Sequence, residues 1–260
     1  MNIKVISTNI RFENPADNTN NWPFRKDFWA KIIMSKTPDI ISTQEGRKPQ
    51  LMDAEKSLGN YSHTYKNRSW IEERMYPCIF VSEAWKVIDS GDRWLSETPD
   101  VPASSSFGSM FPRLMTYAHI KNKKSDIEIM VVNCHLDHMN SSTRDSQSKV
   151  LLNQIKKLNP TMVPTILTGD FNESPFESVR KNINDSKIVP IDPWFDLHLE
   201  EEGTHHKFTG DNHETKRIDW ILSSEELSPL KAKILKHNDL GKYPSDHFPI
   251  FAHFKFNKKD

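Results

Sequence analysis

The apolar segments of this chain are short, and several of them end in a polar side chain. Runs of this length, with alternating or continuous apolar residues, are typical of β-strands. Strands that finish in acids, amides and histidines can bring groups from distant parts of the sequence to one edge of a sheet. The polar residues at these ends are Asn9, Glu45, His135, Asp170 and Asn172.

The order of the predicted elements indicates a β-rich chain with interspersed helices. Strands are predicted over 3–9, 39–45, 113–121, 126–137, 164–172, 217–222 and 248–256. Helical spacing of apolar residues predicts helices over 24–36, 49–58 and 143–158. The stretch 78–96 is predicted to form two strands that turn around Asp89, Ser90 and Gly91. This order fits two sheets packed face to face with helices outside.

Length and composition narrow the class of protein. A chain of 260 residues without a linker, repeat or low-complexity tract is expected to form one domain over 1–260. Lys and Arg together number 35, as do Asp and Glu, so no global excess of positive charge favours a long nucleic-acid duplex. Cys78 and Cys134 lie in apolar runs and are expected to be buried free thiols. We expect a soluble monomer without a membrane segment or signal peptide, cytoplasmic or secreted after signal removal.

The polar strand ends have structural and functional interpretations. Taken singly, Asn9 could be a turn former, Glu45 a solvated acid and His135 a hydrogen-bonded edge residue. Several acids gathered at one place are costly unless a cation or hydrogen bonds compensate them. Oxygen ligands suit Mg²⁺ or Mn²⁺, and the chain lacks the Cys and His spacing of a zinc site.

A set of motifs in order makes the functional interpretation specific. The chain carries STNIRF with Asn9, PDIISTQE with Glu45, VVNCHLD with His135, LTGDFN with Asp170 and Asn172, RIDWIL with Asp219, and SDHFPI with Asp246 and His247. This series resembles the endonuclease/exonuclease/phosphatase superfamily, the fold of deoxyribonuclease I and exonuclease III, and it spans nearly the whole chain. The resemblance implies an α/β fold, a four-layer α-β-β-α sandwich of two mostly antiparallel sheets flanked by helices.

The resemblance also implies a role for each motif residue in a Mg²⁺-dependent (or Mn²⁺-dependent) phosphoesterase. Glu45 would be the main metal ligand, with Asn9 beside it and Asp246 direct or through water. His247, held by Asp219, would act on the attacking water or stabilise the pentacovalent phosphate. The remaining roles are water orientation or deprotonation by Asp170, a hydrogen bond to phosphate from Asn172 and binding of a phosphoryl oxygen by His135. Whether His247 or Asp170 is the base stays open.

The branch of the superfamily is indicated by further stretches. Residues 21–45 resemble the nocturnin and poly(A)-deadenylase branch and its bacterial relatives, which 89–100, 111–120 and 133–147 also resemble. One departure is Arg11, which stands where some abasic-site nucleases of the family carry an acid. A second metal ligand at that position is therefore in doubt.

Several side chains near the motifs have two interpretations. Arg144 either reaches a substrate phosphate or is a solvated charge, and Phe208 either stacks on a substrate ring or anchors its loop. His138 is expected at the surface, and so is at least one of His205 and His206. Asn21, Trp22 and Arg25 either frame the site or, for Trp22, belong to the core.

Three functional hypotheses follow. The first is a metal-dependent phosphodiesterase acting on a nucleotide or a single-stranded nucleic acid. The second is a phosphomonoesterase acting on a nucleotide or sugar phosphate. The third is a binding module that keeps the fold without catalysis, against which the complete set of acids and histidines argues. Selectivity depends on the loops, and their sequences do not identify the substrate.

Overall fold

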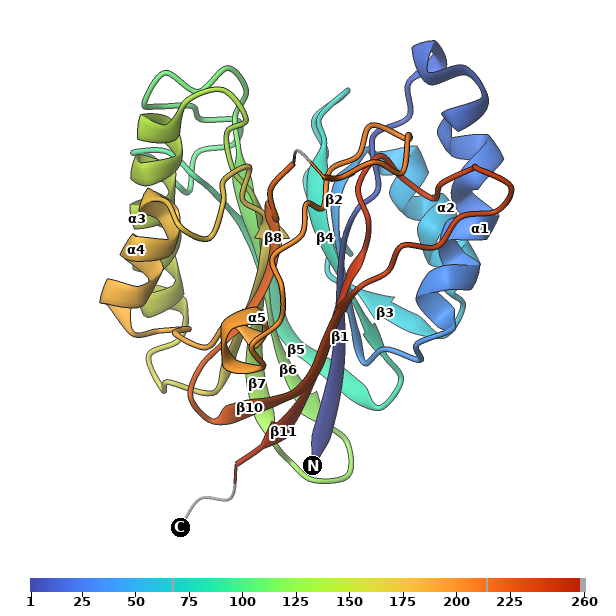
Figure 1. Ribbon diagram of the computed structural model, residues 1–260. Coiled ribbons are helices and arrows are strands. Elements are labelled where there is room, and N and C mark those ends of the chain that lie inside the picture. The colour runs from blue at the N-terminus through green and yellow to red at the C-terminus, as the bar shows by residue number, and fades with distance from the viewer. Residues whose placement is uncertain (67, 214, 258–260) are drawn as a thin grey trace.

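Two β-sheets packed face to face form the centre of the computed structural model, which describes residues 1–66, 68–213 and 215–257 (Figure 1). The six-stranded sheet has the order β10-β11-β1-β2-β4-β3, and the five-stranded sheet the order β5-β6-β7-β8-β9. The first comprises β1 (Asn2–Asn9), β2 (Ile40–Gly46), β3 (Tyr61–His63), β4 (Tyr76–Ser82), β10 (Leu227–Ile234) and β11 (Ile250–Phe256). The second comprises β5 (Trp85–Trp94), β6 (Leu114–Asn122), β7 (Glu128–His135), β8 (Thr165–Asp170) and β9 (Asp219–Ser223).

Helices cover the outer face of each sheet (Figure 1). The helices are α1 (Trp22–Met34), α2 (Lys48–Leu58), α3 (Ser141–Leu158), α4 (Ser178–Ser186) and α5 (Pro193–Asp196), with a short 3-10 helix at Pro15–Asn20. Apolar side chains of α1 and α2 pack with those of β1, β2 and β4. Those of α3 and α4 pack with β6, β7 and β8. The predicted four-layer sandwich is confirmed.

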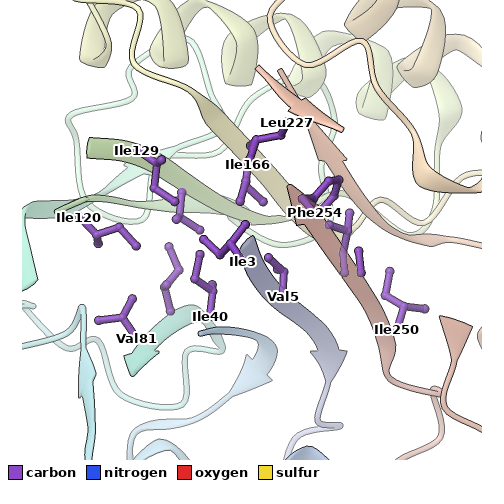
Figure 2. Close-up of a cluster of buried hydrophobic side chains, with 14 of the residues drawn as sticks. Ile3, Val5, Ile40, Val81, Ile120, Ile129, Ile166, Leu227, Ile250 and Phe254 are labelled. Carbon is purple, nitrogen blue, oxygen red and sulfur yellow. The ribbon is translucent and has the colours of Figure 1, made fainter. Parts of the chain in front are cut away.

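The layer between the sheets is an apolar core, mostly aliphatic with some aromatic side chains such as Phe254 (Figure 2). Because side chains alternate across a strand, β1 sends Ile3 and Val5 into this core and Ile6 to the helix-covered face. The alternating apolar residues of the last strand, from Ile250 to Phe256, face the same core. Cys78 and Cys134 are buried free thiols, as expected.

Two parallel pairs interrupt sheets that are otherwise antiparallel. β1 pairs in parallel with β2, and β7 pairs in parallel with β8. Parallel neighbours end at the same edge of a sheet, so each sheet collects two polar strand ends at one edge. Among the described residues, no helix combines the length and apolarity needed to cross a membrane.

One predicted turn is wrong. Residues Asp89, Ser90 and Gly91 lie inside β5, which pairs with β6 from Trp85 to Trp94 with one irregularity between Val87 and Asp89. The chain instead reverses at residues 83–84, between β4 and β5. At Gly91 a Cβ would lie 3.1 Å from the ring of Tyr117 on β6, so the glycine admits a close cross-strand contact.

Candidate active site

The polar ends of three neighbouring strands stand in one row at an edge of the five-stranded sheet. His135 ends β7 and pairs with Asp170 at the end of β8, and Asp170 pairs with Asp219 at the start of β9. All three side chains are buried. Strand register alone therefore brings together a histidine and two acids that span 84 positions of the sequence (219 − 135).

The six-stranded sheet meets this row through Asn9 and Glu45. The Asn9 amide donates hydrogen bonds to Glu45 Oε1 (3.1 Å) and to Asp170 Oδ2 (2.9 Å), which joins the two sheets at the edge. Its oxygen accepts the backbone N–H of Arg11 (2.9 Å). Glu45 is half-buried and has a φ of 66°, an uncommon value for a residue with a Cβ, at the point where the pairing of β2 with β4 becomes irregular.

His247 is oriented by Asp219. Its Nδ1 lies 2.9 Å from Asp219 Oδ2, so Nδ1 carries the proton of this hydrogen bond and Nε2 faces Asp170 at 3.9 Å. Burial opposes charge on the ring, but Asp219, and then Asp170 and Asp246, outweigh it and raise the His247 pKa well above its usual value. The geometry favours a positively charged imidazole at the centre of the site.

The carboxyl group of Asp170 is held from three directions. Asn9 donates to one oxygen, the backbone N–H of Asn172 donates to the other (2.9 Å), and His135 Nε2 lies at 3.5 Å. Burial and the neighbouring charge of Asp219 raise the Asp170 pKa to about 7. A carboxyl group with such a pKa can exchange a proton near neutral pH.

His135 and Asn172, on either side of Asp170, differ in what they offer a ligand. Burial, with Arg113 and His247, lowers the His135 pKa well below its usual value, so this ring is neutral. The Asn172 amide donates one hydrogen bond to the Leu136 carbonyl (3.1 Å). A side-chain amide has two N–H donors, so one donor of Asn172 is left for a ligand.

Asp246 and His247 face different partners although they are adjacent. Asp246 Oδ2 lies 3.9 Å from both Arg11 Nε and His205 Nε2, and Ser245 Oγ donates to the Asn9 carbonyl (2.6 Å). His205 forms an isolated β-bridge with His247. The loop 203–210 thus adds a histidine to the site, although no motif signal distinguished it from its neighbour.

The expected exposure of the histidines is confirmed only in part. His138 is exposed, and His205 is half-buried. His206 is buried and stacks on Phe248 with ring centroids 3.9 Å apart. The expectation that one of this pair faces solvent holds in part, since the His205 side chain is 29% exposed, while His206 is covered because the loop folds back onto the segment that precedes β11.

Arg144 is not the solvated charge that one interpretation predicted. Its side chain is buried, Nε donates to Glu173 Oε2 at 2.8 Å, and another nitrogen donates to the Asp137 carbonyl. Glu173 also accepts the backbone N–H of Val179 at the start of α4. The ion pair therefore ties α3 to the loop that carries Asn172, and the guanidinium has partners other than a substrate.

The aromatic residues named from the sequence divide between core and rim. Trp22 belongs to the core. Phe208 is half-buried with a φ of 61°, and the Arg25 guanidinium lies 5.7 Å from its ring centre. Arg25 is itself fixed by the carbonyls of Ile10 and Pro244. Substrate binding by Phe208 stays a prediction.

Three groups of side chains have the geometry to hold a metal ion. Within the described residues these groups are Glu45 with His135 and Asp170, Asp170 with Asp219 and His247, and His205 with Asp246 and His247. The first group joins two carboxylates, suits a hard divalent cation and lies beside Asn9. Asp246 groups with the histidines rather than with Glu45, so its role as a ligand stays a prediction.

A narrow cavity beside Glu45 and His135 contains charges that sequence reasoning missed. Its lining includes Arg74, Phe111 and Arg113. Arg113 directly precedes β6 and is the one charged residue at the start of an otherwise strand-like run, a signal of the same kind as the polar strand ends.

The amino-acid sequence matches a known family model and one curated protein. A family model described as the Endonuclease/Exonuclease/phosphatase family matches residues 6–247. Uncharacterized protein L388 of Acanthamoeba polyphaga mimivirus is 30% identical over 197 residues, which is 69% of this chain and 72% of that protein.

Solved structures agree with the family match. A family protein of Bacteroides thetaiotaomicron has 26% identity, 99% coverage of both chains and a TM-score of 0.87. The mannosyl-6-phosphatase of the same species has 26% identity, covers 98% of this chain and 100% of its own, and has a TM-score of 0.86. The human nocturnin catalytic domain shares the fold at 21% identity, with 98% and 94% coverage and a TM-score of 0.77. The expected likeness to nocturnin and to bacterial members is confirmed, and the chain belongs to the Endonuclease/Exonuclease/phosphatase family of phosphoester hydrolases.

Proposed function

We propose that this protein is a divalent-metal-dependent phosphoester hydrolase that uses a water molecule as its nucleophile. The observation that carries the proposal is the joining of polar ends from both sheets, with Asn9 bonded to Glu45 and Asp170 and with His247 held by Asp219. A fold that buries acids and histidines in this arrangement bears a cost that a bound cation and a phosphate would offset.

Glu45 is the residue that would chiefly hold the cation, with Asn9 beside it. Their oxygens match the ligands that Mg²⁺ and Mn²⁺ prefer. A divalent cation supplies charge neutralisation at a phosphoryl oxygen and at the leaving oxygen. Asp246 is a candidate further ligand, direct or through water, and His205 beside it extends the same edge of the site.

The chain's own residues account for the proton movements of hydrolysis. The water oxygen forms a bond to phosphorus while the bond from phosphorus to the leaving oxygen breaks. Asp170 is placed to take the proton of the attacking water, because its carboxyl group is held by Asn9 and Asn172 N–H and has a raised pKa. His247, kept charged by Asp219, stabilises the developing negative charge, and the leaving oxygen takes a proton from solvent.

Two substrate classes remain from the sequence analysis. The motifs favour a phosphodiesterase acting on a nucleotide or single-stranded nucleic acid. Similarity to a mannosyl-6-phosphatase at 26% identity supports the second candidate, a phosphomonoesterase acting on a sugar phosphate or nucleotide. Each candidate uses the same water, acids and histidines, so the two differ in what surrounds the phosphate.

The test compares wild type with Glu45→Gln, Asp170→Asn and His247→Ala, with exposed His198→Ala as a matched control. Bis(p-nitrophenyl) phosphate, p-nitrophenyl phosphate and mannose 6-phosphate are assayed with Mg²⁺, with Mn²⁺ and with a chelator. We expect metal-dependent turnover and a loss of about 10²- to 10⁴-fold in each site variant, with no change in the control. Full turnover in both Asp170→Asn and Glu45→Gln would overturn the proposal.

A further inference from the structure

Arg113 is a buried cation whose hydrogen bonds are incomplete. Its side chain is 7% exposed, and its Nε is buried without a partner among the described residues. One of its amino groups lies 3.2 Å from His138 Nδ1. A guanidinium removed from water normally finds an anion or several carbonyl groups, because an uncompensated buried charge is costly.

Three other buried arginines of this chain meet that requirement, whereas Arg180 on α4 does not, since its Nε and one amino group also have no partner among the described residues. Arg217 is paired with both Asp192 (2.9 Å) and Glu201 (2.6 Å), and Arg144 is paired with Glu173 (2.8 Å). Arg25 donates to several backbone carbonyls. The described residues provide no carboxylate at ion-pairing distance from Arg113, although the charges of Glu45, Asp170 and Asp137 act on it. Arg113 therefore has no direct anionic partner among the described residues.

The position of Arg113 indicates what that partner is. Arg113 and Arg74 line one cavity together with Glu45 and His135, and Arg74 Nε is also buried without a partner among the described residues. The cavity thus has two guanidinium groups on its lining, beside the candidate metal ligand Glu45 and the candidate phosphate-binding residue His135. Guanidinium groups in such a place favour an anionic ligand. The cavity is narrow, so it admits the free end of a ligand rather than the middle of a chain.

We propose that Arg113, with Arg74, binds the terminal phosphoryl group of a phosphate monoester and thereby selects monoesters over diesters. The proposal rests on the proposed phosphoester hydrolysis and deepens it by naming the substrate class. A monoester phosphate is a dianion with three free oxygens, whereas a diester carries one charge and two free oxygens. A bidentate guanidinium contact therefore favours the monoester through both charge and geometry.

The first experiment measures kcat/KM for p-nitrophenyl phosphate and bis(p-nitrophenyl) phosphate in wild type, Arg113→Met, Arg113→Lys and Lys149→Met. Lys149 lies on the exposed side of α3 and controls for loss of one positive charge. We expect Arg113→Met to lose about 10- to 100-fold on the monoester and less than about 3-fold on the diester. Arg113→Lys should recover part of the monoester activity, since it keeps the charge without the planar fork. Equal losses on the two substrates, or no loss on the monoester, would overturn the proposal.

The second experiment measures the binding of inorganic phosphate to metal-free protein by isothermal titration calorimetry. We expect phosphate binding in wild type and Lys149→Met, and at least a tenfold weaker binding in Arg113→Met. Unchanged binding in Arg113→Met would overturn the anion subsite. This measurement separates the two proposals: if wild type hydrolyses neither substrate but Arg113 still governs phosphate binding, hydrolysis fails while the anion subsite stands.

Discussion

Two buried arginines of this protein have opposite surroundings. Arg217 lies beside α5 with every nitrogen of its guanidinium bonded to Asp192 or Glu201, and it packs on the Trp194 ring. Arg113 lies beside the candidate active site with its Nε unpartnered among the described residues. The charge of Arg217 is compensated by carboxylates of the protein itself. For Arg113 we infer that the compensating anion is a ligand. The same contrast holds for acids, since Asp192 is fully paired and Asp219 has one buried oxygen without a described partner.

The largest expected effect tests this contrast through stability. Arg217→Met should lower the free energy of unfolding by about 3–5 kcal/mol, because it leaves the buried Asp192 without its counter-charge. Arg113→Met should lower it by less than about 1 kcal/mol or raise it, because it removes an incompletely paired buried charge. Urea unfolding of both variants and of Lys149→Met gives the comparison. Destabilisation of Arg113→Met to the level of Arg217→Met would show that Arg113 is structural.

A smaller effect is expected when a divalent cation is added. Mg²⁺ or Mn²⁺ at about 100 times its dissociation constant should raise the free energy of unfolding by about 2.7 kcal/mol, since it binds the folded state at Glu45. Thermal unfolding with the metal and with a chelator measures the change. Glu45→Gln should lose the stabilisation, whereas Glu128→Gln, at an exposed position of β7, should keep it. A metal response that survives in Glu45→Gln would place the cation elsewhere.

The smallest expected effect concerns pH and His206. Burial, with the charge of His247, lowers the His206 pKa to about 4, so the fold favours the neutral ring. The unfolded chain binds a proton below about pH 6.5, and the stability that depends on the neutral ring is therefore lost as pH falls from 6.5 towards 4. Between pH 7 and pH 5 this loss should be about 1–2 kcal/mol. Urea unfolding at both pH values should show a weaker pH dependence in His206→Phe, and an unchanged dependence would contradict the burial of a neutral His206.

Much of the fold could be predicted because local pattern and tertiary structure agree. The alternating run after Phe248 and the apolar run before Asp170 form strands as expected, because their side-chain periodicity matches the buried faces that they meet. The turn predicted at Asp89–Gly91 failed for the opposite reason. Turn-forming residues there are overridden by continuous pairing of β5 with β6.

The candidate site could be predicted as far as its motifs extend. Asn9, Glu45, His135, Asp170, Asn172, Asp219, Asp246 and His247 are gathered at one edge, where the ends of β1, β2, β7 and β8 meet. Arg144, His205 and Arg113 could not be placed in the same way. Whether an arginine is paired with a carboxylate or left open depends on groups from other elements, as with Arg144 and Glu173.

The sequence by itself determined most of the strands, the helices α1, α2 and α3, and the set of polar residues that end the strands, because periodicity and strand-end chemistry are local properties. It gave no prediction for β3, β10, α4 or α5. Only the tertiary structure decided which buried charged groups are paired with other groups of the protein and which are not. The Asn9 amide contacts Asp170 across 161 positions of the sequence, and Arg113 lies in the electrostatic field of Glu45 and Asp170 without a direct ion pair to either. Electrostatic compensation acts over a few ångströms in space and is indifferent to distance along the chain, so only the folded molecule reveals where a partner is missing.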